Sequence, residues 1–461
     1  MQRQFYQLIF KVPVSGKFCS HYFHATCLLF ACVVCLALKA GAQNTSLLLS
    51  KYHHAGNKAA KEKAAKAIVK AGIPFDSVYI SLQKGRNYSG QVSRGFLKWD
   101  RHTKEGIHLF ALVLIPWNYT PEKKWPVRVV LHGDISHMDS YNVFRFIDTT
   151  QAAYRSVQEI RVYPSGYFAA RWYYKIQYEN VMQLLDSIKQ LYNVDENLVS
   201  LGGFSDGGTG TYAFANYDVT PFNCFLPYIG SCGSLRVLGI KQAYFNNYRN
   251  RPFFIENGKQ DETFPPSVVM PYVEQIMRLN NVVNFFMIDT SGHSLKWIPL
   301  LKDSIDHFVL SHPRNPHPGY IVWQTEHPAI FNRNHWVLIT GIGKTASNAP
   351  ELIDYNEVVI NGQYRQAFRR DSLAGHIEAT VTGNTITVRT KNITSYKLLL
   401  SPEQVDFSKP CTIITNGILS FEGLLDKEVS VLLKWNSLDN DRTMLYGAEM
   451  NIQVGKTFKS R

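Results

Sequence analysis

The chain has 461 residues, which is long for a single domain. Its formal net charge is +13, but no nucleic-acid-binding motif accompanies the basic residues, so we expect no nucleic-acid partner. Four of the seven cysteines precede residue 43, and the three that remain exclude a disulfide scaffold. No Cys/His spacing typical of a metal site occurs, and we expect no cofactor.

Residues 1–42 have the composition of a secretory signal peptide. They contain four basic and no acidic residues, and the uncharged apolar run 25–38 is shorter than the ~20 residues needed to span a bilayer. Ala40-Gly41-Ala42 fits a small-residue cleavage site. We therefore expect cleavage after Ala42, a secreted or periplasmic protein, and no stable membrane span. The basic segment before the apolar run is longer than in most signal peptides, so a form that stays anchored by this segment is the alternative.

Residues 43–94 are predicted to be an N-terminal helical and connecting segment. An Ala-rich stretch carries regularly spaced lysines, and Gly72 and Pro74 end it, which predicts one basic helix. Such a helix could bind anionic polymers or lipid headgroups. A solvated basic face is the simpler interpretation.

Residues 95–311 are predicted to be an α/β domain with a mainly parallel sheet. Segments 96–99 and 107–114 have the pattern of antiparallel entry strands, and strands and helices then alternate. In such sheets ligands bind at the carboxyl ends of the strands. The apolar strand 127–131 ends in His132-Gly133-Asp134, and we expect the backbone N–H of Gly133 or Asp134 to donate to a developing oxyanion. The alternative is a turn whose N–H groups contact only water.

An aromatic cluster follows the predicted strand 160–163 near the same edge. We expect Trp172 above all, with Tyr167, to line a substrate pocket. Core packing is the alternative interpretation. The cluster consists of Tyr167, Phe168, Trp172, Tyr173 and Tyr174.

The run 203–208 has the sequence Gly-Phe-Ser-Asp-Gly-Gly. An apolar strand precedes it and a potential helix follows, which is the setting that a G-x-S-x-G nucleophile elbow requires. The turn forces a strained backbone at Ser205, and the flanking glycines avoid side-chain clashes. Ser205 is therefore the predicted nucleophile, and the N–H of Asp206 is the predicted second oxyanion donor.

A base and an orienting acid follow in the expected order. Asp261 comes just after the buried strand 253–255, in a polar loop that begins at Glu256, and His293 follows the strand 282–288. We assign His293 as the base and Asp261 as the acid. Asp289 and Glu262 are the competing acids. Asp289 is expected to cap the turn that leads to His293.

A Pro-rich segment, 312–321, is predicted to be a linker. Beyond it, 322–461 shows period-two alternation with hairpin turns at Gly383-Asn384 and Asn416-Gly417, which predicts a small antiparallel β-sandwich-like domain. It contains no second catalytic set. Its role is either structural or in binding carbohydrate or polymer, and only Trp323, Trp336 and Trp435 support binding. Cys224 and Cys232 could pair or remain buried thiols.

The sequence resembles the α/β-hydrolase superfamily over about residues 95 to 310. The motifs that carry the resemblance are 131–133, 203–208, Gly258 with Asp261, and 292–294. The most similar groups are secreted serine esterases, such as polyhydroxyalkanoate-depolymerase-like and feruloyl- or acetyl-esterase-like enzymes, and prolyl-oligopeptidase-type catalytic domains. Fewer than 100 residues precede the core, too few for the propeller of many such peptidases.

The resemblance implies an α/β-hydrolase fold, followed here by the β domain, and hydrolysis through an acyl-enzyme. An ester of small-molecule or polymeric type is the first expectation for the substrate, and a peptide is the second. A hydrolase-fold protein that binds without turnover is the alternative from another class. The sequence leaves the oligomeric state open.

Overall fold

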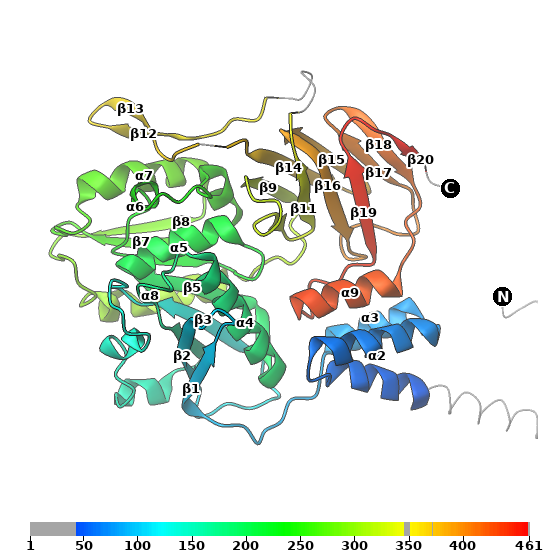
Figure 1. The fold of residues 1–461 in the computed structure, drawn as a ribbon, viewed down its shortest axis with the longest axis horizontal. Coiled ribbons are helices and arrows are strands. Elements are labelled where there is room, and N and C mark those ends of the chain that lie inside the picture. Colours follow the sequence, from blue (N-terminus) through cyan, green and yellow to red (C-terminus); the bar gives the residue numbers. More distant parts are fainter. Residues whose placement is uncertain (1–42, 345–350, 371, 460–461) are drawn as a thin grey trace, which may run out of the picture. The chain divides into compact units, whose positions relative to one another are not determined.

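The computed structural model describes residues 43–344, 351–370 and 372–459 (Figure 1). The predicted signal peptide, 1–42, lies outside these residues. The chain divides into two compact units, which meet in sequence between Pro74 and Phe75. None of the helices in the described ranges combines the length and the apolar character that crossing a membrane requires.

The first unit contains the predicted basic helix, α2 (Lys58–Lys70). Its N-terminus is capped by Asn57, whose side-chain oxygen accepts the Ala60 N–H at 2.9 Å. Gly72 adopts a φ of 63°, a left-handed conformation that glycine adopts readily, and the helix ends just before it. The segment predicted as 43–94 is thus divided, because α3 (Phe75–Lys84) opens the second unit.

The second unit is built on an eight-stranded sheet with the order β1-β2-β4-β3-β5-β6-β7-β8. β1 and β2 are antiparallel, β2 is antiparallel to β4, and all other neighbours are parallel. The strands are β1 (Gly95–His102), β2 (His108–Ile115), β3 (Trp125–Leu131), β4 (Ile160–Pro164), β5 (Val194–Phe204), β6 (Phe225–Tyr228), β7 (Phe253–Gly258) and β8 (Val283–Ile288).

Helices cover both faces of this sheet (Figure 1). α4, α5 and α7 pack on one face with the inward residues of β3 and β5, whereas α8 packs on the other face against Leu226 and Phe254. The helices are α4 (Lys175–Leu191), α5 (Asp206–Tyr217), α7 (Pro266–Leu279) and α8 (Ile298–Ser311). The predicted fold class, a mainly parallel α/β sheet, is confirmed.

Strand β7 is longer than the sequence analysis expected. Glu256 and Asn257 were predicted to open a polar loop, but they lie in the strand and pair with Phe286 and Met287 of β8. Both side chains are buried. The two polar residues were assigned to the loop because a polar pair after an apolar run usually ends a buried strand.

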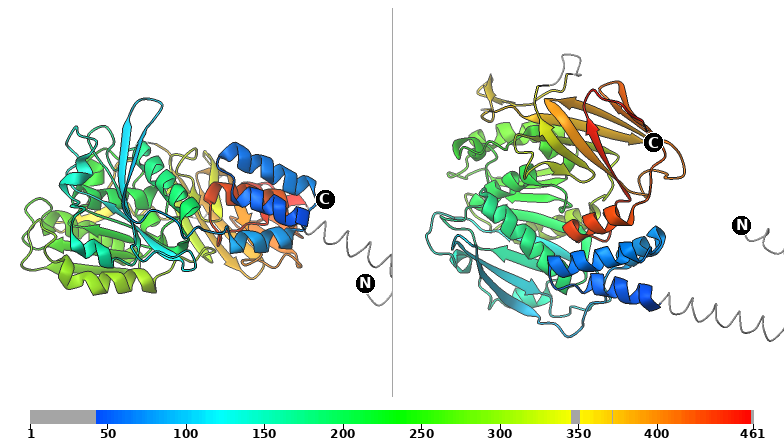
Figure 2. Two further views of the ribbon diagram at one scale, coloured as in Figure 1. Left: turned by 90° about the horizontal axis from the view of Figure 1, so that it is seen from below. Right: turned by 45° about the vertical axis from the view of Figure 1, so that its right-hand side comes forward.

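The C-terminal region consists of three further sheets with the orders β20-β18-β17-β15-β14-β9, β10-β11-β16-β19 and β12-β13 (Figures 1 and 2). Both predicted hairpin turns are present, with Gly383, Asn416 and Gly417 at positive φ. Two strand pairs are parallel, β15–β17 and β18–β20. The sequence analysis did not foresee α9 (Val429–Asp439).

The strands of this region are these: β9 (Tyr320–Thr325), β10 (Arg333–Asn334), β11 (Val337–Ile342), β12 (Glu357–Ile360), β13 (Gln363–Gln366), β14 (Gly375–Thr382), β15 (Thr385–Lys391), β16 (Ile393–Leu400), β17 (Cys411–Thr415), β18 (Ile418–Gly423), β19 (Ala448–Gln453) and β20 (Phe458–Lys459). The short helices of the second unit are η1 (Asn142–Arg145), η2 (Ala152–Ser156), η3 (Phe245–Asn250) and α6 (Ser234–Val237).

The Pro-rich segment is not a free linker. Arg314, in its middle, is buried and donates to Asp441 at 2.7 Å and to the Thr220 carbonyl at 2.9 Å. Gln324 of β9 is also buried, and it accepts the Asn246 amide at 2.8 Å. The C-terminal strands therefore pack directly against the α/β part of the second unit, and one hydrophobic cluster runs through both.

Candidate active site

Ser205 lies in the tight turn between β5 and α5, with φ 56° and ψ −121°. This conformation is strained for a residue with a side chain and requires close packing around it. A Cβ at Gly207 would come within 2.0 Å of the Leu131 carbonyl oxygen, and one at Gly203 within 2.6 Å of Gly207. The glycines of the motif therefore let β3, β5 and α5 approach closely and hold Ser205 at the end of the sheet.

The predicted triad residues lie within hydrogen-bond distance of one another. His293 Nε2 lies 2.8 Å from Ser205 Oγ, and His293 Nδ1 lies 2.9 Å from Asp261 Oδ2. Since the carboxylate can only accept, Nδ1 carries the proton and Nε2 is left as the acceptor for the serine hydroxyl. This is the geometry of a serine-hydrolase triad.

Asp261 is buried and fixed by its own loop. Its Oδ1 accepts the backbone N–H groups of Thr263 and Phe264 at 2.9 and 2.8 Å, which leaves Oδ2 for His293. The loops after β7 and β8 touch at Gly258, where a Cβ would lie 2.4 Å from the Ser291 carbonyl oxygen. Glycine at this position lets the acid and the base approach each other.

The competing acids lie elsewhere. Asp289 is exposed and pairs with Lys259, 3.0 Å away, rather than capping the turn as expected. Glu262 is exposed. Asp206, next to the nucleophile, accepts the Ile135 N–H through Oδ2 at 3.1 Å. Its carboxylate thus ties the start of α5 to the loop after β3.

Of the predicted oxyanion donors, Asp206 and Gly133 adjoin the nucleophile. Asp206 is the first residue of α5, where helical N–H groups have no partner within the helix. Gly133 packs against the nucleophile, because a Cβ there would lie 3.1 Å from Ser205 Cβ. Asp134, in the turn that contains Gly133, has a φ of 44° and is therefore strained, as Ser205 is. The N–H groups of Gly133 and Asp134 remain the predicted partners of Asp206.

The strand order places these parts together at one edge of the sheet. β3, β5, β7 and β8 are parallel, and the oxyanion turn, nucleophile, acid and base follow them respectively. This is the α/β-hydrolase fold. It is identified by a nucleophile elbow between β5 and α5 and by a base and an acid on successive later loops.

No protein-family model and no curated protein sequence matches this chain. Among solved structures, a thermostable esterase is 18% identical over 48% of this chain and 63% of its own, with a TM-score of 0.39. Esterase 2 of Thermogutta terrifontis is 13% identical over 47% of this chain and 94% of its own, with a TM-score of 0.39. The S-formylglutathione hydrolase of Staphylococcus aureus is 16% identical over 48% of this chain and 100% of its own, with a TM-score of 0.38.

His132 supports the predicted oxyanion turn through two hydrogen bonds. Burial lowers its pKa to about 4, so the imidazole is neutral. Its Nε2 accepts the Gly166 N–H at 2.9 Å, and its Nδ1 therefore donates to the Gly133 carbonyl at 2.7 Å. The ring thus links the turn after β3 to the turn after β4.

The predicted pocket role of the aromatic cluster is not supported. Trp172 has no exposed surface, and its indole N–H donates to the His132 carbonyl at 2.9 Å. Tyr167 is 6% exposed and donates to the His108 carbonyl. Both residues hold loops in place rather than offering a surface to substrate. Phe168, by contrast, is 48% exposed, and its N–H donates to the His137 carbonyl beside the oxyanion turn.

The sequence analysis missed a second buried carboxyl close to the acid. Glu256 of β7 is 1% exposed, and within the described residues neither of its oxygens has a hydrogen-bond partner. Burial, with a smaller contribution from the negative charge of Asp261, raises its pKa to about 8. Glu256 is therefore neutral at pH 7, and Asp261 is the carboxylate that binds His293.

The three cysteines among the described residues take no part in the site. Cys224, Cys232 and Cys411 are buried free thiols, so Cys224 and Cys232 do not form the disulfide that the sequence left open. Burial raises the pKa of both Cys224 and Cys232 to about 12, which keeps them protonated and unreactive.

Proposed function

We propose that the protein is a secreted serine hydrolase that cleaves carboxylic esters through an acyl-enzyme. The observation that carries the proposal is the continuous hydrogen-bonded line from Asp261 through His293 to Ser205. The strained backbone of Ser205 adds support, because such strain persists where the surrounding packing enforces it and often accompanies function.

The chemistry follows from the proton positions. Ser205 Oγ attacks the acyl carbon while its proton moves to His293 Nε2, and Asp261 stabilises the imidazolium that results. The N–H of Asp206 and an N–H of the 133–134 turn receive the negative charge of the tetrahedral oxygen. His293 then protonates the leaving alcohol. A water molecule, deprotonated by the same imidazole, releases the acyl group.

A fluorophosphonate probe tests the nucleophile directly. The wild-type chain should be labelled at Ser205, and Ser205→Ala should not be labelled. A panel of p-nitrophenyl esters, acetyl and feruloyl sugars, polyester film and proline-containing peptides then separates esterase from peptidase activity. Faster turnover of peptides than of all esters would refute the ester assignment. Absence of labelling would refute the hydrolase assignment altogether.

The structure offers little for the alternative of a carbohydrate-binding protein without turnover. Trp323 and Trp336 are fully buried, and Trp435 is 6% exposed. Sugar-binding tryptophans present a ring face to solvent, whereas the face of Trp435 is approached by the Arg333 guanidinium at 4.9 Å.

Secretion is the part of the proposal that rests on the leader alone. The basic leader, its short apolar run and Ala40-Gly41-Ala42 support export with cleavage before Gln43. Determination of the N-terminal sequence of the protein recovered from its natural host tests this. A cell-retained chain that still begins at Met1 would refute it.

A further inference from the structure

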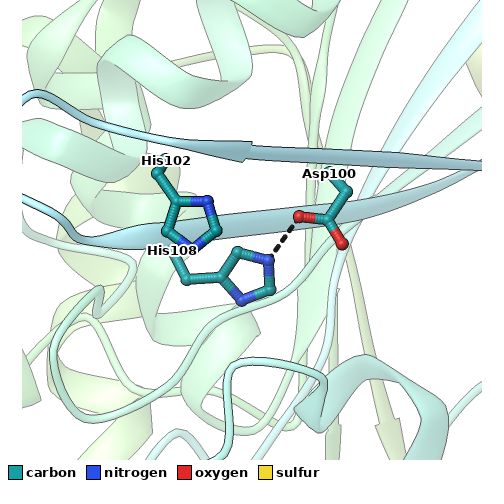
Figure 3. A group of neighbouring side chains, drawn as sticks. All are labelled: Asp100, His102 and His108. Carbon is teal, nitrogen blue, oxygen red and sulfur yellow. Dashed lines mark hydrogen bonds and ion pairs between the residues drawn. The ribbon is translucent and has the colours of Figure 1, made fainter.

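Two histidines and a carboxylate gather on the hairpin of β1 and β2, outside the triad (Figure 3). Asp100 and His102 are two residues apart on β1 and therefore share one face of the strand. His108 opens β2 and pairs directly opposite His102. All three side chains are thus presented from a rigid two-stranded ladder rather than from a loop.

The three side chains offer ligand atoms at distances that suit one metal ion. One ligand atom from each residue lies within 4.8 Å of the other two. His108 Nε2 lies 2.6 Å from Asp100 Oδ1, and the two imidazole rings are 4.6 Å apart and inclined by only 23°. Zinc bonds of about 2.0–2.2 Å to nitrogen and oxygen place neighbouring ligands roughly 3.3 Å apart in a tetrahedron, so small rotations would suffice.

Two of the three candidate ligands, His108 and Asp100, are also oriented by hydrogen bonds to residues of the loop after β3. His108 Nδ1 is hydrogen-bonded to the Ser140 hydroxyl, which directs Nε2 toward Asp100. The second carboxylate oxygen of Asp100 accepts the Tyr141 hydroxyl at 3.1 Å. Metal-binding histidines and carboxylates commonly have such outer partners, which fix the ring orientation.

We propose that Asp100, His102 and His108 bind one zinc-class divalent cation. Two imidazoles and one carboxylate suit Zn²⁺ better than Ca²⁺ or Mg²⁺, which prefer all-oxygen sites. The alternative is a simple ion pair between Asp100 and His108. That pair would not explain why the imidazole of His102 stacks on that of His108. The site is independent of the proposed hydrolase activity.

The position of the site gives the ion a mechanical role. Asn142, next to Tyr141 in sequence, donates to the Asp134 carbonyl at 2.7 Å. Ser140 and Tyr141 therefore belong to the same loop as the predicted oxyanion turn. A bound cation fastens the β1–β2 hairpin to this loop through the two outer hydrogen bonds. The cation would sit on the outer strands β1 and β2 and would supply no atom to the triad.

Zinc titration of the full chain tests the site, with calorimetry after chelator treatment and removal of the chelator. The leader cysteines could bind zinc as well. The quantity to compare is therefore how many fewer zinc equivalents each variant binds than the wild type. His102→Ala and Asp100→Asn should each lose one equivalent. The matched controls, His307→Ala on an exposed position of α8 and His293→Ala in the triad, should lose none. Circular dichroism verifies that each variant is folded.

Outer-shell and coupling measurements sharpen the test. Ser140→Ala should bind the same number of zinc equivalents as the wild type, but with an affinity about 10- to 100-fold lower. Zinc should slow hydrogen exchange of residues 134–142 in the wild type and leave it unchanged in His102→Ala. Equal stoichiometry in wild type and His102→Ala would overturn the proposal, as would loss of an equivalent only in His293→Ala, which would place the ion at the triad.

Discussion

Ser205, His293 and Asp261 come from loops that follow three different strands, and groups outside the triad hold the Ser205 backbone and the Asp261 carboxylate. The backbone N–H of Ser205 donates to the Tyr228 carbonyl at 3.1 Å, which anchors the elbow to β6. Two backbone N–H groups fix the Asp261 carboxylate. The catalytic geometry is therefore set before substrate arrives, which is the condition for efficient transition-state stabilisation.

Removing the nucleophile should abolish turnover and leave the fold intact. Ser205→Ala deletes one hydroxyl, whose only hydrogen bond within the described residues is to His293. We expect ester hydrolysis to fall at least about 1,000-fold with little change in melting temperature. Active-site labelling and thermal melts of the same preparation measure both. Activity near that of the wild type would identify a different nucleophile.

The assignment of the acid distinguishes Asp261 from Asp289, which lie on the loops after β7 and β8. Asp261→Asn should reduce kcat about 1,000- to 10,000-fold, because the amide can no longer stabilise the imidazolium. Asp289→Asn is the matched control, since it removes only an exposed pair with Lys259, and activity should change less than about twofold. Initial rates on one p-nitrophenyl ester decide the matter, and a reversed ranking would show that the acid is misassigned.

Glu256 should make the stability of the protein depend on pH. Its pKa is about 8 in the folded chain and 4.5 ordinarily, so the folded state holds the proton more tightly. As pH rises from 4.5 to 8 the unfolded chain ionises first, and stability falls, by on the order of a few kcal/mol, before levelling off above pH 8. Glu256→Gln should remove this decline.

Urea unfolding at pH 5 and pH 8.5 measures the effect. Glu256→Gln should be close to wild type at pH 5 and more stable at pH 8.5. Lys259 and Asp289 form an exposed pair on the neighbouring loops, so Asp289→Asn serves again as the control and should follow the wild-type curve. Parallel curves for wild type and Glu256→Gln would show that Glu256 is not the titrating group.

At the scale of elements, the junction of β3, β5 and α5 depends on missing side chains. A Cβ at Gly207 would overlap the Leu131 carbonyl, and backbone atoms cannot rotate away as a side chain can. Gly207→Ala should therefore cost more than about 3 kcal/mol of stability or prevent folding. Gly56→Ala is the control, because nothing lies within 4 Å of its Cβ position and its φ is not positive. Similar melting temperatures for both variants would contradict the packing argument.

The sequence was informative where local pattern and chain order determine the structure. The elbow, both entry strands and the two hairpin turns each have a residue-level signature, such as the glycines of 203–208 or Asn416-Gly417. Glu256 could not be predicted, because a carboxyl inside a buried strand contradicts the polarity rule and depends on tertiary surroundings. The burial of Trp172 was equally hidden, since sequence shows that a ring follows a strand but not which way it points.

At the scale of the whole second unit, the C-terminal strands are part of one folded body with the α/β core. Arg251, just before β7, is buried, and its guanidinium reaches His335 of the C-terminal region. Its Nε donates to the Phe222 carbonyl at 2.6 Å. Burial lowers the pKa of Arg251 to about 9 and that of His335 well below its usual value, so the imidazole is neutral and can accept from the guanidinium.

This arrangement predicts that the catalytic region will not fold when it is separated from the C-terminal strands. A chain that ends at Ser311 would expose the apolar surface now covered by β9 and β11 and would lose the buried partner of Arg251. We expect aggregation or a loosely packed state that exposes apolar surface and binds a hydrophobic dye. A soluble, cooperative unfolding transition with activity on small esters would show instead that the two parts are independent.

A single substitution in the full chain tests the same coupling without the truncation. Arg314 and Asp441 are both fully buried, and Arg314→Met would leave the carboxylate without its closest cation. Lys189, 3.9 Å from Asp441, is a second positive group nearby but cannot replace the lost hydrogen bonds. Removing one member of a buried pair costs about 3–5 kcal/mol. Chemical denaturation should show that loss as one cooperative transition for the whole second unit.

The exposed counterpart of Arg314→Met is Lys302→Met, which breaks the surface pair with Asp306 and should cost less than about 1 kcal/mol of stability. Two separate transitions in Arg314→Met, with the triad region unaffected, would contradict a single folded body.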